Sequence, residues 1–332
     1  MDMAIGEARL ARTRTSPNPW VGAVVVAPSG DIVGRGSTNP PGGPHAEVVA
    51  LAAADTSAAG ATLVVTLEPC SHQGRTPPCV DAIVAAGIAR VVIAVPDPDP
   101  QVSGRGIAAL REAGIDVDIG VRADAVEEQL APYLHHRRTG RPYVVCKLAA
   151  SLDGGLAAPD GSSQWITGIE ARTDTHRLRA ESDAIVVGAG TVRADDPTLT
   201  VRHVDGPDPR RVVLGRAPAR ARVHPCTEWV GDEEDLLDEL GRDGIVQLMI
   251  EGGSTVVRNF HERNLIDRYV LYLAPALFCG RDQLPLIAGP TTGTIADIWR
   301  GRFVDVRRLG DDLRVDLVPR HAGQTPDDET NH

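Results

Sequence analysis

The chain has 332 residues and is long for a single domain, so we expect two domains. Its apolar fraction of 42% is enough for an ordinary globular core, but aromatics make up only 3%, so aliphatic side chains must fill that core. The net charge of -11 argues against a broad nucleic-acid or anionic-membrane surface, because such surfaces depend on clustered Lys and Arg.

The cysteines and the first residues indicate a reducing compartment. Five cysteines are few for this length, odd in number and without the spacing of a disulfide framework. The first residues include Asp2 and Glu7 and lack the long apolar stretch of a signal peptide, and no apolar run approaches the length of a bilayer span. We therefore expect a cytoplasmic protein whose thiols stay reduced.

Strands and helices alternate along the first part of the chain. Two Val-rich runs flank the turn Pro28-Ser29-Gly30-Asp31, and Ala-rich segments between strands are typical of helices. The predicted strands lie at 20–37 (two strands), 61–69, 90–100 and 115–121, and the predicted helices lie at 44–54, 79–87 and 104–115. This alternation predicts an α/β layer architecture.

Residues 123–143 begin as a helix and then become basic and turn-rich, which places a domain boundary near 138–143. We expect one domain over residues 1–140, a second over 141–319 and a disordered polar tail over 320–332. The second domain contains predicted strands at 143–154, 184–190, 210–216, 245–253 and 268–278, a helix at 170–182 and a terminal hairpin at 303–318.

Four residues of the first domain have the composition of a catalytic zinc site. His45 opens a predicted helix with Glu47 two residues later, Cys70 follows a predicted strand, and Cys79 opens the next helix. Two thiolates and one imidazole suit zinc, and three protein ligands leave a fourth position open. The order H-x-E followed by P-C-x-x-C is the signature of zinc deaminases, in which the glutamate moves protons. This chain keeps the order, with eight residues between the cysteines in place of two.

The cysteine pair also admits roles outside a catalytic zinc site. A disulfide is disfavoured by the reducing compartment, and two unrelated small hydrophobic residues would leave the histidine and glutamate unexplained. A structural zinc site would need a fourth ligand, which His72 could supply. The chain would then be a zinc-stabilised binding module.

The motifs NPWVGAVVV, HAE and TLEPC resemble the cytidine-deaminase-like superfamily. The longer EPCSHQGRTPPC, with SPNPWVGAVVV and DPDPQVSGRG, resembles the deaminase half of the bifunctional riboflavin-biosynthesis deaminase–reductase family, whereas most nucleic-acid deaminases have only two residues between the cysteines. The resemblance implies a three-layer αβα domain with a mixed sheet, zinc ligands His45, Cys70 and Cys79, and Glu47 as the proton shuttle. Asn18 is either a pyrimidine contact or a turn residue.

The second domain lacks the dinucleotide fingerprint G-x-G-x-x-G, since the stretch GAGT at 188–191 has no third glycine. The stretch EGGST at 251–255 joins a strand to a helix, where glycines allow a phosphate to approach or simply form a tight turn. KLAASLDG, SQWIT, HRLRAESDAIVVGAGTVRADDPTLTVR and IEGG resemble the reductase half of the same family, which has a dihydrofolate-reductase-like α/β fold. The resemblance covers about residues 4–318.

The resemblance also implies which residues form the reductase site. The residues implied for NADPH are Ala149, Trp165, Thr191, Asp195, Gly253 and Ser254. Those implied for the substrate are Ser163, Arg179, Leu199, Arg202 and Glu251, with Lys147 as a further sugar contact. Arginine is suited to a phosphate because its guanidinium offers forked donors.

The family resemblance implies a zinc- and NADPH-dependent enzyme that deaminates 2,5-diamino-6-(5-phosphoribosylamino)pyrimidin-4(3H)-one and then reduces its ribosyl group to ribityl. It also implies a homo-oligomer without nucleic-acid or membrane partners. The short, acidic segment 216–244 leaves the adenine contacts and the choice of NADPH over NADH open. A single-activity deaminase with a degraded reductase domain is therefore the main alternative.

Overall fold

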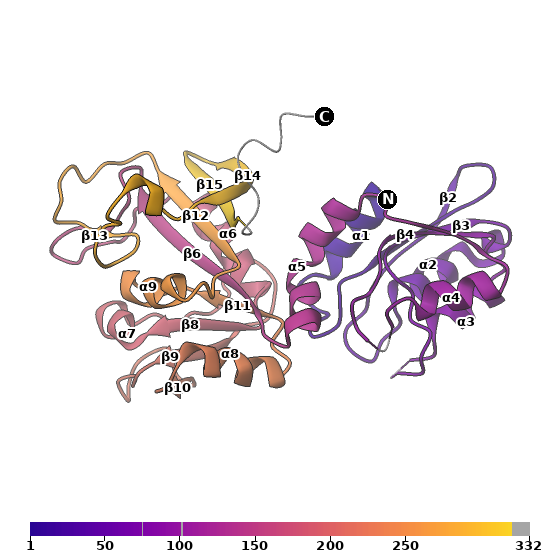
Figure 1. Cartoon of the computed structure of the whole chain (residues 1–332), viewed down its shortest axis with the longest axis horizontal. Helices are drawn as coiled ribbons and strands as arrows, with labels where there is room; N and C mark the ends of the chain where they lie inside the picture. Colours follow the sequence, from indigo (N-terminus) through magenta and orange to yellow (C-terminus); the bar gives the residue numbers. More distant parts are fainter. Residues whose placement is uncertain (75, 101, 321–332) are drawn as a thin grey trace. The chain divides into compact units, whose positions relative to one another are not determined.

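The computed structural model describes residues 1–74, 76–100 and 102–320. Its contacts divide the chain into two units, shown in Figure 1. The first unit contains Met1–Pro142 with Leu240–Val246, and the second contains Tyr143–Glu239 with the residues from Gln247 onward. Of the predicted disordered tail, residues 321–332 lie outside the described residues.

The first unit is built on a mixed five-stranded sheet with the order β2-β1-β3-β4-β5. β1 pairs antiparallel with β2 and β3, whereas β3, β4 and β5 run parallel. The strands are β1 (Gly22–Val26), β2 (Ile32–Ser37), β3 (Thr62–Leu67), β4 (Arg90–Val95) and β5 (Asp116–Ile119), all within segments predicted as strands.

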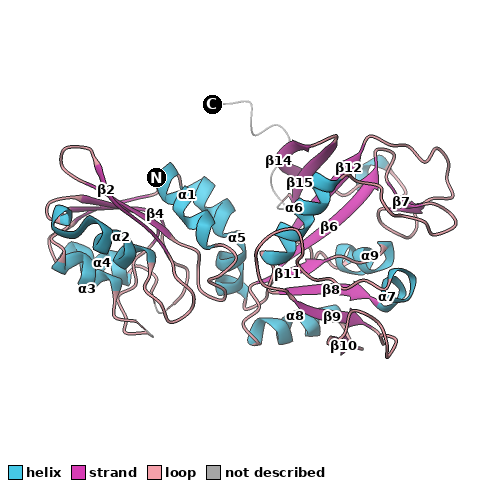
Figure 2. Cartoon of the chain, turned by 180° about the vertical axis from the view of Figure 1, so that it is seen from behind, coloured by secondary structure: helices cyan, strands magenta, loops and turns pink. Residues whose placement is uncertain are grey.

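Helices cover both faces of this sheet. They are α1 (Asp2–Ala11), α2 (Ala46–Ala54), α3 (Cys79–Ala85), α4 (Arg105–Glu112) and α5 (Ala123–Thr139), with a 3₁₀ turn, η1, at Asp55–Ala58. Figures 1 and 2 show α1 and α5 together on one side of the sheet and α2, α3 and α4 on the other. The sheet therefore forms the middle layer of three.

Two helices differ from the sequence prediction. No helix was predicted at α1, and α5 continues to Thr139 through residues predicted to be turn-rich. The basic side chains of this stretch lie in the last turn of α5, where positive charge stabilises the helix dipole. Gly140, with φ of 75°, then ends the helix in the left-handed conformation that glycine adopts without strain.

The backbone of β2 allows α2 to lie directly on the sheet. A Cβ atom at Gly34 would lie 2.1 Å from the Ala50 carbonyl oxygen, and one at Gly36 would lie 2.4 Å from that of Ala46. Both positions thus require glycine, and this close packing fixes the start of α2, which carries His45 and Glu47.

The second unit is built on an eight-stranded sheet with the order β10-β9-β8-β11-β6-β12-β15-β14. Its strands are β6 (Tyr143–Ser151), β8 (Ala184–Gly188), β9 (Arg210–Leu214), β10 (Thr227–Trp229), β11 (Gln247–Ile250), β12 (Arg268–Ala274), β14 (Gly301–Leu309) and β15 (Asp312–Pro319). The strands from β10 to β12 run parallel, and the predicted terminal hairpin of β14 and β15 is confirmed as an antiparallel pair at one edge. The strands β7 (Gly155–Ala157) and β13 (Leu284–Pro285) form a separate pair.

Four helices connect these strands. They are α6 (Ile169–Ala180), α7 (Ala189–Asp195), α8 (Glu233–Arg242) and α9 (Ser254–Glu262), with a 3₁₀ turn, η2, at Ile295–Asp297. The short, acidic sequence of 216–244 suggests a reduced strand–helix step, but the segment contains both a strand, β10, and a helix, α8. In α8, Leu236, Leu237 and Leu240 are buried, so an amphipathic helix lies within the acidic run.

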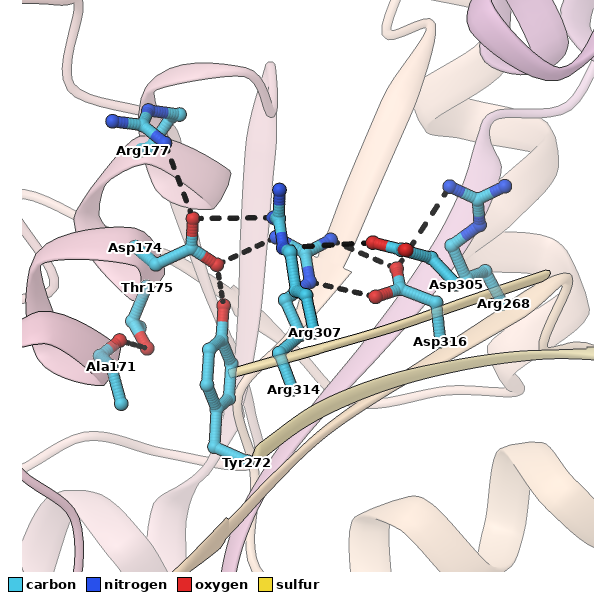
Figure 3. Close-up of polar contacts among 10 residues, drawn as sticks. All are labelled: Ala171, Asp174, Thr175, Arg177, Arg268, Tyr272, Asp305, Arg307, Arg314 and Asp316. Atoms are coloured by element: carbon cyan, nitrogen blue, oxygen red, sulfur yellow. Dashed lines mark hydrogen bonds and ion pairs between the residues drawn. The ribbon is translucent and has the colours of Figure 1, made fainter. Parts of the chain in front are cut away.

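A buried polar network attaches α6 to β12 and β15 (Figure 3). The Asp174 carboxylate accepts hydrogen bonds from the Tyr272 hydroxyl at 2.8 Å and from Arg314 Nη1 at 2.6 Å. Arg314 also donates from Nε and Nη2 to the two oxygens of Asp316, at 2.7 and 2.8 Å. The network satisfies both buried carboxylates and fixes α6, the helix that also carries Arg179.

None of the helices in the described part of the chain combines the length and the apolar character that crossing a membrane would require.

Candidate active sites

The first site is a cluster of His45, Cys70 and Cys79 in the first unit. His45 Nδ1 lies 3.6 Å from Cys70 Sγ and 3.2 Å from Cys79 Sγ, and the three ligand atoms lie within 4.8 Å of one another. Both thiols are free, so the structure contains no Cys70–Cys79 disulfide. The structure therefore brings together the three residues proposed from the sequence as metal ligands.

Each member of the cluster lies at the end of a secondary-structure element. His45 is the N-cap residue of α2, Cys70 follows β3, and Cys79 is the first residue of α3. The Cys79 backbone N–H donates to Cys70 Sγ at 3.4 Å, and the Val80 N–H donates to the Cys70 carbonyl at 3.2 Å. The start of α3 thus holds the loop that carries Cys70.

The protonation of the cluster is asymmetric. A hydrogen bond from the Cys79 thiol lowers the pKa of Cys70 to about 4, against the effect of burial, and His45 stabilises the thiolate further. The pKa of Cys79 is raised, first because its proton is shared with Cys70 and second because it is buried. Cys70 is therefore the more acidic of the two thiols.

Glu47 lies in the first turn of α2 and is 4% exposed. Burial raises the pKa of its carboxyl group to about 7, against the opposing effect of His45. A carboxyl group with this pKa can both accept and release a proton near neutral pH. It is thus a buried acid–base group next to the cluster.

The donor set fits zinc. Tetrahedral zinc with bonds of about 2.0–2.3 Å separates its ligand atoms by roughly 3.3–3.8 Å, close to the two distances from His45. Among the described residues, the cluster that could hold a metal contains His45, Cys70 and Cys79 and does not include His72. Asn18, the other candidate of this domain, lies in a turn in which its backbone N–H donates to the Thr15 carbonyl at 2.8 Å.

Glu68, which the sequence analysis did not single out, fixes the loop that leads to Cys70. One carboxylate oxygen accepts the backbone N–H groups of Asp97 and Gly104 at 3.2 and 3.1 Å. The other accepts those of Gly106 and Ile107 at 3.0 and 3.2 Å, in the first turn of α4. Glu68 thereby joins the end of β3 to the loop after β4.

Gly106 is part of the same junction. A Cβ atom at this position would lie 1.9 Å from the Pro69 carbonyl oxygen, so only glycine allows the backbone of α4 to approach the segment before Cys70. Gly106, the last residue of the motif DPDPQVSGRG, therefore lets α4 pack against the segment that leads to Cys70.

The second site is a cavity of about 1510 Å³ in the second unit. All of the reductase residues proposed from the sequence line it: Lys147, Ala149, Ser163, Trp165, Arg179, Thr191, Asp195, Leu199, Arg202, Glu251, Gly253 and Ser254. These residues come from β6, α6, α7, α9 and the connecting loops, so residues more than a hundred positions apart share one cavity.

Glu251 is the centre of an ion-pair group in this cavity. Arg179 donates to both of its carboxylate oxygens, from Nε at 2.8 Å and from Nη2 at 2.7 Å, and Lys147 Nζ lies 3.6 Å from Oε1. Burial alone would raise the pKa of Glu251, but the charges of Arg179 and Lys147 lower it to about 2. Burial lowers the pKa of Lys147, although Glu251 acts in the opposite direction.

Two strand-to-helix turns lie side by side at another part of the cavity. Gly188 precedes α7 and Gly253 precedes α9. A Cβ atom at Gly188 would lie 2.8 Å from Val256 Cγ2, and one at Gly253 would lie 3.3 Å from Thr191 Oγ1. A side chain at either glycine would crowd this junction, and the start of a helix such as α9 is a type of site that binds phosphate.

Trp165, Asp195 and Leu199 are further proposed residues that line the cavity. Trp165 is 69% exposed, and the Arg172 guanidinium lies 4.7 Å from its ring centroid. Burial raises the pKa of Asp195. Leu199 is buried with φ of 53°, an unusual conformation for a residue that is not glycine.

Several basic residues of the cavity were not predicted from the sequence, among them His176 and Arg222. His176, on α6, accepts the Arg202 backbone N–H at Nδ1 over 3.1 Å, and its pKa is lowered to about 4, first by burial and then by Arg179. Arg222, from the loop between β9 and β10, also lines the cavity. Neither residue belongs to a motif that marks a binding site: His176 lies on one face of a helix, and Arg222 lies in an irregular loop.

Comparison with protein families matches both parts of the chain. Residues 1–95 match the cytidine and deoxycytidylate deaminase zinc-binding region, and residues 142–315 match the RibD C-terminal domain. The first match contains the metal cluster, and the second contains the cavity.

Curated relatives and solved structures match nearly the whole chain. The riboflavin biosynthesis protein RibD of Mycobacterium tuberculosis H37Rv is 44% identical, with 96% of both chains covered, and that of Escherichia coli K12 is 39% identical, with 96% of this chain and 98% of the relative covered. The structure of Acinetobacter baumannii RibD, form 1, superposes with a TM-score of 0.89 at 37% identity, covering 96% of this chain and 98% of the other.

A Thermotoga maritima structure, described as a diaminohydroxyphosphoribosylaminopyrimidine deaminase/5-amino-6-(5-phosphoribosylamino)uracil reductase, superposes with a TM-score of 0.88 at 34% identity. It covers 96% of this chain and 97% of the other. These matches confirm the predicted fold class, a cytidine-deaminase-like N-terminal domain followed by a dihydrofolate-reductase-like C-terminal domain.

Proposed function

Since the chain belongs to the RibD family, we propose that residues 1–140 form its deaminase domain, with the metal cluster as active centre, and that residues 141–319 form its reductase domain, with the cavity as active centre. The chain is a bifunctional enzyme of riboflavin biosynthesis, a zinc-dependent pyrimidine deaminase and an NADPH-dependent reductase that acts on a phosphorylated pyrimidine. The family membership confirms three predictions from the resemblance: a phosphorylated pyrimidine as substrate, zinc, and NADPH as cofactor.

In the deaminase domain, His45, Cys70 and Cys79 would hold the zinc ion, which would supply Lewis-acid activation of water near neutral pH. Glu47 takes a proton from the attacking water, delivers it to a ring nitrogen of the pyrimidine and protonates the departing amine. Water thus replaces the amino group and ammonia leaves. The observation that supports this role is the buried Glu47 carboxyl with a pKa of about 7 beside the cluster.

In the reductase domain, bound NADPH would supply a hydride, that is two electrons and a proton, to the ribosyl carbon. We assign its binding to Ala149, Trp165, Thr191, Asp195, Gly253 and Ser254, with its phosphates at the start of α9. We assign the substrate to Ser163, Arg179, Leu199, Arg202 and Glu251. We further propose that Glu251 hydrogen-bonds the ribose hydroxyls or assists ring opening, and that Lys147, 3.6 Å from it, contacts the sugar.

We also propose that the enzyme acts in the cytoplasm as a homo-oligomer without nucleic-acid partners, as the low cysteine content, the charge of -11 and the family resemblance suggest. Size-exclusion chromatography with light scattering tests the oligomeric state, and a monomer at micromolar concentration would contradict it.

A coupled assay on purified, zinc-replete protein tests the function. The diaminopyrimidinone ribosyl phosphate is supplied with and without NADPH, and ammonia release and NADPH oxidation are followed together. We expect ammonia in both reactions and NADPH oxidation that depends on prior deamination. Ammonia without NADPH oxidation would indicate a single-activity deaminase, and the absence of both would refute the assignment.

A further inference from the structure

The positive charge of Arg179 is already neutralised within the reductase cavity. Its Nε and Nη2 donate to Glu251, and its Nη1 donates to the Thr200 carbonyl at 3.1 Å. Lys147 also faces Glu251. A substrate or cofactor phosphate therefore needs positive charge from other residues of the cavity.

Arg202 has the opposite surroundings. Its guanidinium is exposed and donates from Nη1 to the hydroxyl groups of Thr198 and Thr200, the latter at 2.9 Å. These bonds orient the guanidinium but do not neutralise it. In the described part of the chain, no carboxylate forms an ion pair with Arg202, so its charge remains available to an anion.

Arg222 brings a second uncompensated guanidinium to the same cavity. Its backbone N–H donates to Asp196 Oδ1 at 2.7 Å, which holds the Arg222 backbone beside the segment that carries Thr198 and Arg202. Over residues 1–74, 76–100 and 102–320, no acidic side chain forms an ion pair with the Arg222 guanidinium.

Both arginines line the same cavity, and the Arg222 backbone is bonded to Asp196, six residues before Arg202. The pKa of Arg202 is lowered first by burial and then by the positive charges of Arg179 and Arg222, although Glu251 and Asp208 act in the opposite direction. Two like charges in one cavity repel each other, and a dianion between them reduces that cost. Two guanidinium groups can each offer a fork of N–H donors to one phosphate.

We propose that Arg222 and Arg202 together form a subsite for a phosphate monoester in the reductase cavity. The inference rests on the proposed reductase site and adds Arg222 to it. Two phosphate monoesters enter this cavity during the reaction, the 5′-phosphate of the substrate and the 2′-phosphate of NADPH. Both present the same dianion, so the test must distinguish them.

The test variant is Arg222→Gln, which removes the charge from an exposed side chain, and the matched control is Arg220→Gln. Arg220 is exposed on the same loop but does not line the cavity. Thermal unfolding verifies that both variants fold. The KM is measured for the deaminated 5′-phosphate substrate and for its dephosphorylated form, and the Kd is measured for NADPH and NADH by fluorescence titration, which requires no turnover.

If the subsite binds the substrate, Arg222→Gln raises the KM for the phosphorylated substrate about tenfold or more and leaves that for the dephosphorylated form unchanged. If the subsite binds the cofactor, the Kd of NADPH rises about tenfold or more and the Kd of NADH does not change. A tenfold loss of affinity corresponds to about 1.4 kcal/mol of binding free energy. Arg222→Lys, which keeps the charge but not the fork, recovers part of the loss.

Equal behaviour of wild type, Arg222→Gln and Arg220→Gln toward all four ligands would overturn the inference while leaving the reductase assignment intact. An equal loss for the phosphorylated and unphosphorylated ligands would also overturn it, because a phosphate subsite discriminates between them. A wild-type protein that neither binds nor oxidises NADPH would instead refute the reductase assignment itself, and the subsite with it.

Discussion

Arg179 binds Glu251 through two parallel hydrogen bonds of 2.8 and 2.7 Å, so that a helix of the second unit and the segment after β11 are joined at one carboxylate. Lys147 Nζ lies 3.6 Å from Glu251 Oε1, the oxygen that also accepts Arg179 Nη2. Two cations thus depend on one anion, and the anion is the group with the strongly lowered pKa of about 2. The reductase cavity is organised around this pairing.

Replacing Glu251 with Gln should abolish reduction and leave deamination intact. The variant leaves Arg179 and Lys147 without their anion, and breaking such a largely buried pair costs about 3 kcal/mol of unfolding free energy. Thermal unfolding, NADPH oxidation and ammonia release measure the three effects. NADPH oxidation at the wild-type rate would contradict a role for Glu251 in the reaction.

Replacing Glu47 with Gln should reduce ammonia release about a hundredfold or more, because glutamine cannot carry a proton. Zinc content should stay at the wild-type level, since His45, Cys70 and Cys79 remain. Asp81→Asn, which changes an exposed carboxylate on α3, is the matched control and should retain activity. A variant Glu47→Gln with full activity would favour the zinc-stabilised binding module instead.

The metal cluster could be predicted because its ligands lie in short motifs at the ends of elements that the sequence pattern identified. The partners of Glu68 could not, because they are backbone N–H groups 29 to 39 residues further along the chain. Backbone donors carry no side-chain signature, so only the fold reveals that the glutamate of TLEPC is a structural clamp.

The second domain shows a different limit. Its cavity residues could be named only through the family resemblance, because no dinucleotide fingerprint marks them. The helix α8 was missed because its acidic residues hide three buried leucines, and its presence removes the physical ground for expecting a reduced strand–helix step at 216–244. Arg222 was missed because its loop has no periodicity, and its position depends on a tertiary contact with Asp196.

Replacing Glu68 with Gln should loosen the loop that carries Cys70. The amide would direct its NH₂ group at two backbone donors that now share an oxygen, leaving them unsatisfied at about 1–2 kcal/mol each. We expect a lower unfolding temperature and faster loss of zinc to a chelator. The exposed Glu127→Gln is the control, and zinc release from Glu68→Gln at the wild-type rate would contradict the clamp.

Asp97 should make the stability of the deaminase domain depend on pH. Burial raises the pKa of this carboxyl from 3.8 to about 6, although the Asp99 N–H and the Tyr133 hydroxyl donate to it. The folded protein therefore holds a proton between about pH 4 and pH 6 that the unfolded chain releases. The stabilisation of the folded protein by this proton is complete below about pH 4. It is lost as the pH rises through the folded-state pKa of about 6.

A separation of about two pH units corresponds to about 3 kcal/mol, so the unfolding free energy of wild type relative to Asp97→Asn should fall by about that amount from pH 4 to pH 7. Denaturant unfolding of both proteins across this range measures the difference. A difference that stays constant with pH would show that the two forms of Asp97 are equally stable in the folded protein.

Replacing Arg314 with Met should destabilise the reductase domain more than any surface arginine does. Asp174 is 3% exposed and Asp316 is 1% exposed, and both take their shortest ion pairs from Arg314 (Figure 3). Burial acts to raise the pKa of Asp174, but the larger combined effect of Arg314 and the Tyr272 hydroxyl lowers it. The carboxylate therefore stays charged and depends on Arg314. Removing the arginine leaves two buried charges poorly compensated, at a cost of about 3–5 kcal/mol.

Arg307 provides a control within the same network, because its 43% exposed side chain also contacts Asp174, at 3.4 Å. Arg307→Met should cost less than about 1 kcal/mol, as exposed pairs usually do. Because α6 carries Arg179 and His176, the loss at Arg314 should also raise the KM for the ribosyl substrate, whereas ammonia release should not change. Similar unfolding free energies for the two variants would contradict this prediction. They would show that the buried and the exposed arginine contribute equally to stability through Asp174.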